Sequence, residues 1–188
     1  MMPPASFVLS RSNLAARDRP AAPTWLRYTG YVRARPPAAD HLKLLRPYGP
    51  NIQELALSAR RLILEEAPRA NEFVYEVYTI ADHFSLTERP SDAFVFTTTH
   101  ANWVNLGFNF GAHLPDPRGL LRGDGKLIRH VRISQPVDLD APGVRELVRA
   151  AMEQADRPEA KAAKPVTVVR ARQSAGKRPT RNRPSVRA

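Results

Sequence analysis

"WVNLGFNF", residues 103–110, is the stretch of this 188-residue sequence that decides its fold. Its residues form two alternating sets: the apolar set is Val104, Leu106, Phe108 and Phe110, and the other set is Trp103, Asn105, Gly107 and Asn109. Successive side chains of a strand point to opposite faces of a sheet. The pattern therefore predicts a β-strand that packs its apolar set against helices and carries the second set on the opposite face.

Four neighbouring segments extend this strand into a sheet. They have period two or are rich in aromatic and β-branched residues, both typical of strands: "EFVYEVYT" (72–79), "HFSLTE" (83–88), "AFVFTTT" (93–99) and "LIRHVRI" (127–133). The connections are short, which favours antiparallel pairing. Residues 93–114 contain no Asp, Glu, Lys or Arg, but their threonines, asparagines and histidines indicate a hairpin rather than a membrane span.

Two amphipathic helices flank the predicted strands. From Pro50 to about residue 66, apolar residues recur with the spacing of one helical face: Ile52, Leu55, Ala56, Ala59, Leu62 and Ile63. Asp140 is placed to cap a second helix, whose apolar stripe is Val144, Leu147, Val148 and Ala151. We therefore predict an α+β fold, with an antiparallel sheet of about five strands flanked by an N-terminal and a C-terminal helix on one face.

Composition divides the chain into three parts. Residues 39–156 form the predicted α+β domain, and they contain 13 Lys/Arg against 16 Asp/Glu. Residues 1–38 are proline-rich, with six Lys/Arg against one Asp/Glu, and are predicted to be a disordered or mis-annotated N-terminal extension. Residues 157–188, with ten Lys/Arg against one Asp/Glu, are predicted to be a disordered basic tail rich in Ala and Pro. The net charge of +11 therefore arises at the two ends.

The middle of the chain resembles a known family. "VNLGFNFGAHLPDPRGLLRGDGKLIRHVRI" (104–133), with the helix from Pro50 and "NEFVYEVY" (71–78), is similar to the YdhG-like family, a bacterial domain of unknown function. The resemblance covers roughly residues 40–155. Because that family has been linked to frataxin-like iron chaperones, it implies a small α+β fold and iron as a candidate cofactor. The first helix departs from the acidic pattern of frataxins, since its only carboxylates are Glu54, Glu65 and Glu66.

The glycines of "RGDGK" (122–126) pose the question of nucleotide binding. A P-loop requires G-x-x-x-x-G-K-[ST]. Position 120 is Leu rather than Gly, and Leu127 follows Lys126 where Ser or Thr is needed. Asp124-Gly125 is typical of a tight turn, so we favour a turn over a phosphate cradle.

The sequence contains no recognisable catalytic pattern. No two histidines have the i, i+4 spacing of a zinc protease, no serine lies in a G-x-S-x-G context, and there is no cysteine. We therefore assign no catalytic residue and expect a binding module rather than an enzyme. The absence of cysteine excludes disulfides and thiolate metal sites, and it fits a cytoplasmic location.

The alternation places polar side chains together on the sheet face away from the helices. The predicted ligand-binding set is Glu76, Tyr78, Asn105, Asn109, His130 and Arg132. Amide, imidazole, guanidinium, carboxylate and phenol groups suit a small polar ligand. The alternative is an ordinary solvated face of an antiparallel sheet. A metal, iron above all, would be bound by a second predicted set: Glu72, Glu76, Asp82 and His83.

The basic tail favours a polyanionic partner. Cations without neighbouring acids attract nucleic acid through counterion release, without sequence specificity. The predicted contacts are Lys161, Lys164, Arg170, Arg172, Lys177, Arg178, Arg181 and Arg183. The alternative is a tail that only solubilises the protein. The sequence thus predicts a binding module for a small ligand, metal or protein, with nonspecific nucleic-acid association or iron delivery as alternatives.

Overall fold

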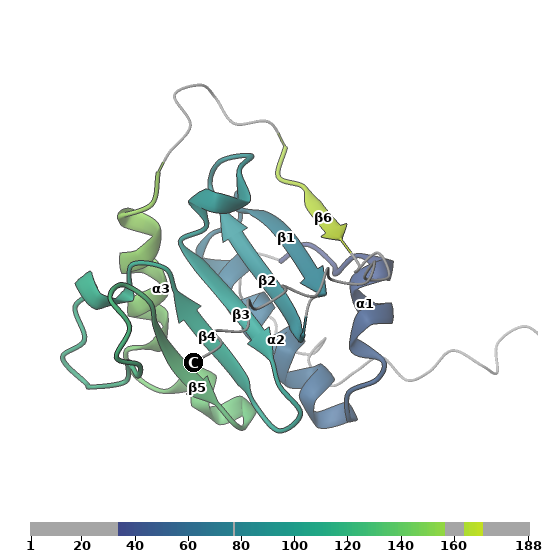
Figure 1. The fold of residues 1–188 in the computed structure, drawn as a ribbon, viewed down its shortest axis with the longest axis horizontal. Coiled ribbons are helices and arrows are strands. Elements are labelled where there is room, and N and C mark those ends of the chain that lie inside the picture. The colour runs from purple at the N-terminus through teal and green to yellow at the C-terminus, as the bar shows by residue number, and fades with distance from the viewer. Residues whose placement is uncertain (1–33, 77, 157–163, 171–188) are drawn as a thin grey trace, which may run out of the picture. The chain divides into compact units, whose positions relative to one another are not determined.

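The computed structural model describes residues 34–76, 78–156 and 164–170. Six strands form one sheet in the order β5-β4-β3-β2-β1-β6 (Figure 1). Their bounds are β1 Asn71–Glu76, β2 Ile80–Ser85, β3 Val95–Thr99, β4 Val104–Phe108, β5 Arg129–Ile133 and β6 Thr167–Arg170. All neighbouring strands are antiparallel except β1 and β6, which are parallel. The α+β prediction is confirmed, and the sheet has one strand more than expected.

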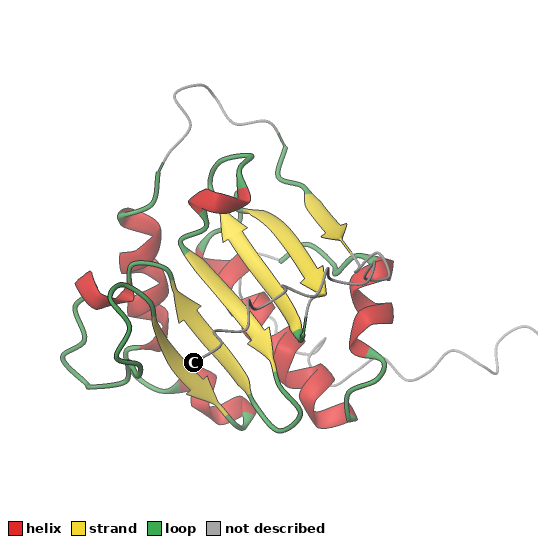
Figure 2. Ribbon diagram, viewed as in Figure 1, coloured by secondary structure: helices red, strands yellow, loops and turns green. Residues whose placement is uncertain are grey.

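Three α-helices accompany the sheet: α1 Ala39–Leu45, α2 Pro50–Glu66 and α3 Val144–Glu153. In Figure 2, α2 and α3 lie behind the sheet and cover one of its faces. The bounds of α2 agree with the prediction, and Pro50 occupies its first turn, where the missing N–H costs nothing. Short 3-10 helices lie at Pro90–Asp92, Gly111–His113 and Pro136–Asp140.

The core lies between the sheet and these helices. Val104, Leu106 and Phe108 are all 0% exposed, as the alternation predicted. All the apolar residues predicted to face the core from α2 and α3 are buried as well. Burying one such side chain contributes about 1.5–3 kcal/mol, so the alternating strand strongly fixes which face meets the helices. Phe110 is 53% exposed, because β4 ends at Phe108 and the chain turns away there.

Several element boundaries differ from the prediction, since β1 ends at Glu76, β2 begins at Ile80, β3 begins at Val95 and β5 begins at Arg129. β2 ends at Ser85 instead of continuing to residue 88, because Thr87 takes part in a turn. The Thr87 amide donates to Ser85 Oγ at 3.0 Å, and its hydroxyl donates to Asp92 Oδ2 at 2.7 Å. The last helix begins at Val144, and Asp140 lies in the preceding 3-10 helix. Glu146 replaces the predicted cap, since its carboxylate accepts the Gly143 amide at 2.9 Å.

Parts of both predicted extensions are ordered. Residues 167–170 form β6, whose side-by-side pairing with β1 corrects the assignment of 157–188 as wholly disordered. At the other end, the Arg35 guanidinium donates from Nε to Thr167 Oγ1 at 3.1 Å. Residues from both flanks of the predicted domain therefore meet at the β6 edge of the sheet.

The glycine-rich loop before β5 is a longer connection than the predicted tight turn. Arg122 and His130 pair as an isolated antiparallel bridge, and residues 123–128 form the loop that leads into β5. Arg129 Nη1 donates to the carbonyls of Gly125 and Ile128, at 2.5 and 2.9 Å. These carbonyls surround a guanidinium, whereas a phosphate cradle needs converging amide N–H groups. The geometry supports a structural loop.

Candidate functional site

The carboxylates of the strands all lie on one face of the sheet. The strands contain three carboxylates, and all of them point towards the helices: Glu72, Glu76 and Asp82. Glu72 is bonded by Arg60 of α2, Asp82 faces His41 of α1, and Glu76 lies beside Leu44 and Tyr48. The opposite face, called the open face below, has no carboxylate contributed by a strand.

Register shows which side chains share the open face, because residues paired across a ladder point to the same side. One row crosses the whole sheet: Arg170, Tyr75, Ala81, Thr98, Asn105 and Arg132. A second, parallel row contains Val168, Phe73, His83, Phe96, Gly107 and His130. Each row therefore combines aromatic or imidazole rings with cationic or polar groups at the β5 edge.

A platform of rings occupies the middle of the open face. The rings of His83 and Phe96 are nearly parallel, with an interplanar angle of 19° and centroids 5.5 Å apart. Tyr75 meets His83 edge-on at 5.6 Å. Phe96 lies over the neighbouring strand at Gly107, where an added Cβ would come within 2.2 Å of Phe96 Cζ. Gly107 thus leaves room for this ring to lie against the sheet.

A second aromatic group lies at the hairpin between β3 and β4. The His100 ring stacks on Trp103, with centroids 4.8 Å apart, and the Arg132 guanidinium carbon lies 4.0 Å from the Trp103 ring centroid. His100 Nε2 lies 3.1 Å from Thr98 Oγ1 and 3.2 Å from Asn105 Nδ2. The side-chain oxygen of Asn105, Oδ1, is buried without a hydrogen-bond partner among the described residues. Trp103 thus contacts both His100, at the β3–β4 hairpin, and Arg132 of the first row.

The histidines of the open face are biased towards their neutral form. Burial, and then the charges of Arg122, His100 and Arg132, lower the pKa of His130. Burial, and then Arg132, lower the pKa of His100. The same positive groups that disfavour protonation there would be stabilised by a bound anion. The face is therefore electrostatically suited to an anionic ligand.

The structure brings together half of the predicted ligand-binding set. Asn105, His130 and Arg132 share the open face. Asn109 follows the end of β4, and its side-chain amide donates to the Ala93 carbonyl at 2.5 Å. Glu76 lies on the helix side instead, because it has the same parity in β1 as buried Glu72, and Tyr78 lies beyond the end of β1 and is 83% exposed. Both line a separate pocket.

Several members of the open face were absent from the predicted set. Phe96, Trp103, His83 and His100 supply its rings. The signal was present in the sequence, since Trp103 belongs to the outward set of the alternating stretch and Phe96 alternates with buried Val95 and Thr97. An aromatic residue on the outward-facing side of an alternating strand therefore indicated a surface with a role beyond contact with solvent.

A buried charged cluster lies on the helix side of the sheet. It comprises His41, Arg60, Glu72 and Asp82, which are 0–3% exposed. The Arg60 guanidinium donates to both Glu72 oxygens, at 2.6 and 2.8 Å, and Thr167 Oγ1 donates to Glu72 Oε2 at 2.7 Å. His41 lies between the two acids, with Nδ1 3.8 Å from Glu72 Oε1 and Nε2 3.4 Å from Asp82 Oδ1.

The two acids of this cluster differ in their ionisation. Burial opposes the charge of Glu72, but the hydrogen bonds and charge of Arg60 outweigh it and lower the pKa of Glu72. Burial raises the pKa of Asp82 to about 6, although His41 and the hydroxyl of Thr97 favour its charged form. Asp82 is therefore the acid of this cluster whose charged form the folded protein disfavours.

The cluster tests the prediction of a metal site. His41, Glu72 and Asp82 each offer a ligand atom, and these atoms lie within 4.8 Å of one another. His41 was not predicted as a ligand, His83 lies on the opposite face, and Glu76 lies outside the group. Both oxygens of Glu72 are already occupied by Arg60, and removing one member of a buried pair is costly. The arrangement fits a structural ion-pair network better than an iron site, so iron binding stays a prediction.

The predicted nucleic-acid contacts fall mostly outside the described residues. Lys164 precedes β6 and is exposed, and Arg170 ends β6 on the open face. The remaining six lie outside the described ranges: Lys161, Arg172, Lys177, Arg178, Arg181 and Arg183. Arg170 is thus the member of the predicted set that the structure connects to the open face.

Comparisons with known proteins do not identify the chain. No family model matches it, and no curated protein or solved structure is significantly similar to it. Among the described residues, no helix combines the length and apolar character needed to cross a bilayer. The resemblance to the YdhG-like family stays a prediction, and any functional proposal rests on the geometry above.

Proposed function

We propose that this protein binds single-stranded nucleic acid on its open face. The observation that carries the proposal is the separation of charge across the sheet. The carboxylates of the strands face the helices, whereas Arg132, Arg170 and His130 share the open face with the ring platform. A surface that combines cations with accessible rings can contact both the phosphates and the bases of an unpaired strand.

Base stacking would use the rings of the platform. His83 and Phe96 are half-buried, so each ring is held in place and still partly accessible. Stacking of a base on an aromatic side chain contributes about 1–3 kcal/mol and tolerates any base. Unpaired bases are required, since the bases of a duplex are stacked on each other. This favours a single strand over a double helix.

Phosphate contacts would come from the ends of the polar row. Arg170 on β6 and Arg132 on β5 lie at opposite edges of the six-stranded sheet. With strands about 4.8 Å apart, the row is about 24 Å long, enough to contact several nucleotides. Residues 171–188 add six Lys/Arg and no Asp/Glu, which would strengthen the electrostatic part of binding.

The proposal is tested by fluorescence anisotropy of labelled oligothymidylate and oligouridylate with the full-length chain. We expect Phe96→Leu, which keeps apolar volume but removes a ring, to weaken binding about tenfold. We expect Arg132→Gln to weaken it as well and to reduce the slope of log affinity against log salt by about 0.7. Inorganic polyphosphate, which has no bases, should be insensitive to Phe96→Leu.

Two matched variants distinguish the open face from general electrostatics. Arg46→Gln removes an exposed cation from the end of α1, and Phe110→Leu removes an exposed ring that lies beyond β4. Neither should change affinity by more than about twofold. Equal losses in Arg46→Gln and Arg132→Gln, or unchanged affinity in Phe96→Leu, would show that the open face is not the binding surface.

A further inference from the structure

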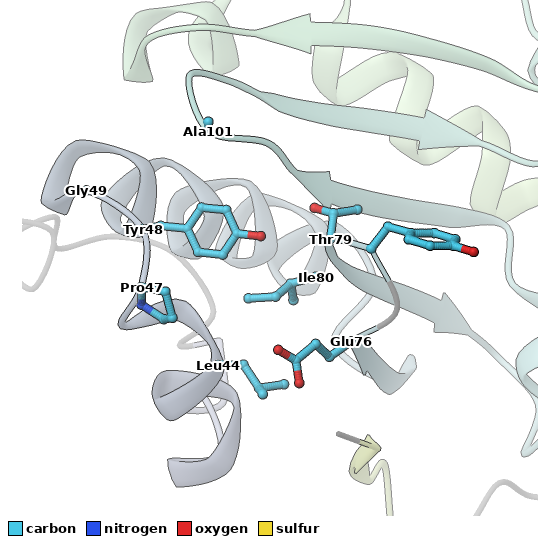
Figure 3. A pocket seen from close by; sticks show the side chains of 9 residues that line it. Leu44, Pro47, Tyr48, Gly49, Glu76, Thr79, Ile80 and Ala101 are labelled. Carbon is cyan, nitrogen blue, oxygen red and sulfur yellow. The ribbon is translucent and has the colours of Figure 1, made fainter. Parts of the chain in front are cut away.

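A second concave site lies on the helix side, away from the open face. It is a pocket of about 370 Å³ between the α1–α2 connection and the turn joining β1 to β2 (Figure 3). This volume is within the range of small-molecule sites. Leu44, Pro47, Tyr48 and Ile80 give it apolar and aromatic walls, and Glu76 and Thr79 add polar groups. The pocket shares no lining residue with the open face.

Among the described residues that line this pocket, Glu76 is the only acidic residue, and none is Lys, Arg or His. It is half-buried, and among the described residues no Lys, Arg or His forms an ion pair with it. The other two strand carboxylates have such neighbours. Arg60 pairs with Glu72, and His41 Nε2 lies 3.4 Å from Asp82 Oδ1. A carboxylate at the wall of this pocket is therefore left available to an external cation.

The groups around Glu76 suit the apolar part of such a cation. In Figure 3 the side chains of Leu44, Ile80 and Glu76 point towards a common space, and the Tyr48 ring lies across from them. Ile80 is 2% exposed and forms a fixed floor. A cation close to an aromatic face gains about 0.5–2 kcal/mol beyond its ion pair.

The backbone around the pocket is fixed and offers little to an anion. Gln53 Nε2 donates to the Tyr48 carbonyl at 2.7 Å, which fixes the α1–α2 connection. At the start of α2, Pro50 has no amide proton, and the Ile52 and Gln53 amides both donate to the Gly49 carbonyl, at 2.9 and 3.0 Å. The start of α2 therefore leaves few amide donors for an anion.

From this geometry we infer that the pocket binds a small organic cation with an apolar body. Glu76 supplies the counter-charge, Tyr48 the aromatic face, and Leu44 with Ile80 the apolar floor. The site is independent of the nucleic-acid surface, because the two lie on opposite sides of the sheet.

The test uses isothermal titration calorimetry of the full-length chain with choline, with benzylamine, and with dimethylbutanol, the uncharged isostere of choline. We expect at least one of the two cations to bind. If choline binds, dimethylbutanol should bind about tenfold more weakly than choline. Glu76→Gln should weaken binding of the cation about tenfold, and Tyr48→Leu should weaken it further than Tyr48→Phe.

Glu54→Gln is the matched control, since it removes an exposed carboxylate from α2 outside the pocket. It should leave cation binding unchanged, and thermal melting followed by circular dichroism should show that Glu76→Gln is folded. Failure of both cations to bind would overturn the inference. So would dimethylbutanol binding as tightly as choline where choline binds, or equal effects of Glu76→Gln and Glu54→Gln.

Discussion

Gly107 owes its position in β4 to the aromatic ring beside it. Any other residue would place a Cβ within 2.2 Å of Phe96 Cζ, a distance that real contacts do not reach. The ring would then have to rotate away from the sheet and from its parallel partner His83. A glycine that weakens a strand by its flexibility is thus retained for a close approach of a neighbouring side chain. The close packing of Phe96 over Gly107 shows that this part of the open face is a tightly fitted surface.

Asp82 makes the stability of the protein depend on pH. Burial raises its pKa to about 6 in the folded state, above the ordinary 3.8. The folded protein therefore binds more protons than the unfolded chain in this window, and the contribution of Asp82 to stability decreases as pH rises from about 4 to 6. Thr97 and His41 offset only part of the cost of the ionised form.

We expect Asp82→Asn to remove this dependence. Relative to the wild type, the variant should gain about 2–3 kcal/mol of unfolding free energy between pH 4 and pH 7. Urea unfolding at a series of pH values measures this difference. Asp92→Asn is the control with the opposite sign, because a hydrogen bond from the Thr87 hydroxyl lowers the pKa of Asp92. A difference between wild type and Asp82→Asn that is constant with pH would contradict the assignment.

β6 shows how an edge element completes the buried cluster. Its Thr167 donates to Glu72 and accepts from Arg35, so one hydroxyl joins β1 to residues preceding α1. The Val166 amide also donates to the side-chain oxygen of Asn71, at 3.0 Å. Without β6, the parallel edge of β1 would lose these partners together with its ladder bonds.

We expect two C-terminal truncations, which remove residues 171–188 and residues 164–188, to differ in stability. Removing 171–188 leaves β6 in place and should change the melting temperature little, while weakening oligonucleotide binding through lost charge. Removing 164–188 takes away β6 as well, and should lower stability by about 2–4 kcal/mol because buried Glu72 loses a hydrogen bond. Thermal melting of both variants measures this. Equal stability of the two would mean that β6 does not stabilise the sheet.

The elements that the sequence predicted well are those with a strong local pattern. α2 and β4 agree with it because their apolar residues repeat with a single period over one face. β6 and α1 were not predicted, since a four-residue strand and a two-turn helix depend on contacts far along the chain. The site follows the same division: alternation indicated Asn105, His130 and Arg132, whereas the cluster of His41, Arg60 and Glu72 needed the tertiary fold.

Over the whole molecule, charge is arranged on two levels. Along the chain, the excess of Lys and Arg lies in residues 1–38 and 157–188, and residues 39–156 are mildly acidic. Across the sheet, the acids of the strands lie on the helix side, so the open face carries Arg132 and Arg170 without a strand carboxylate. Net charge alone would have assigned polyanion binding to the ends. The proposed binding surface adds the open face to them.

Proton uptake should accompany binding to this surface. Burial, and then neighbouring positive groups, lower the pKa of His130 and His100 in the free protein, and phosphates bound nearby would raise both values again. The complex then holds more protons than the free protein, so affinity should increase as pH falls from about 7.5 to 5.5. Anisotropy titrations at constant ionic strength measure the slope. His130→Gln should reduce it, whereas His113→Gln, an exposed histidine beyond β4, should not. Affinity that is independent of pH across this window, or equal slopes in both variants, would mean that the strand does not lie against these histidines.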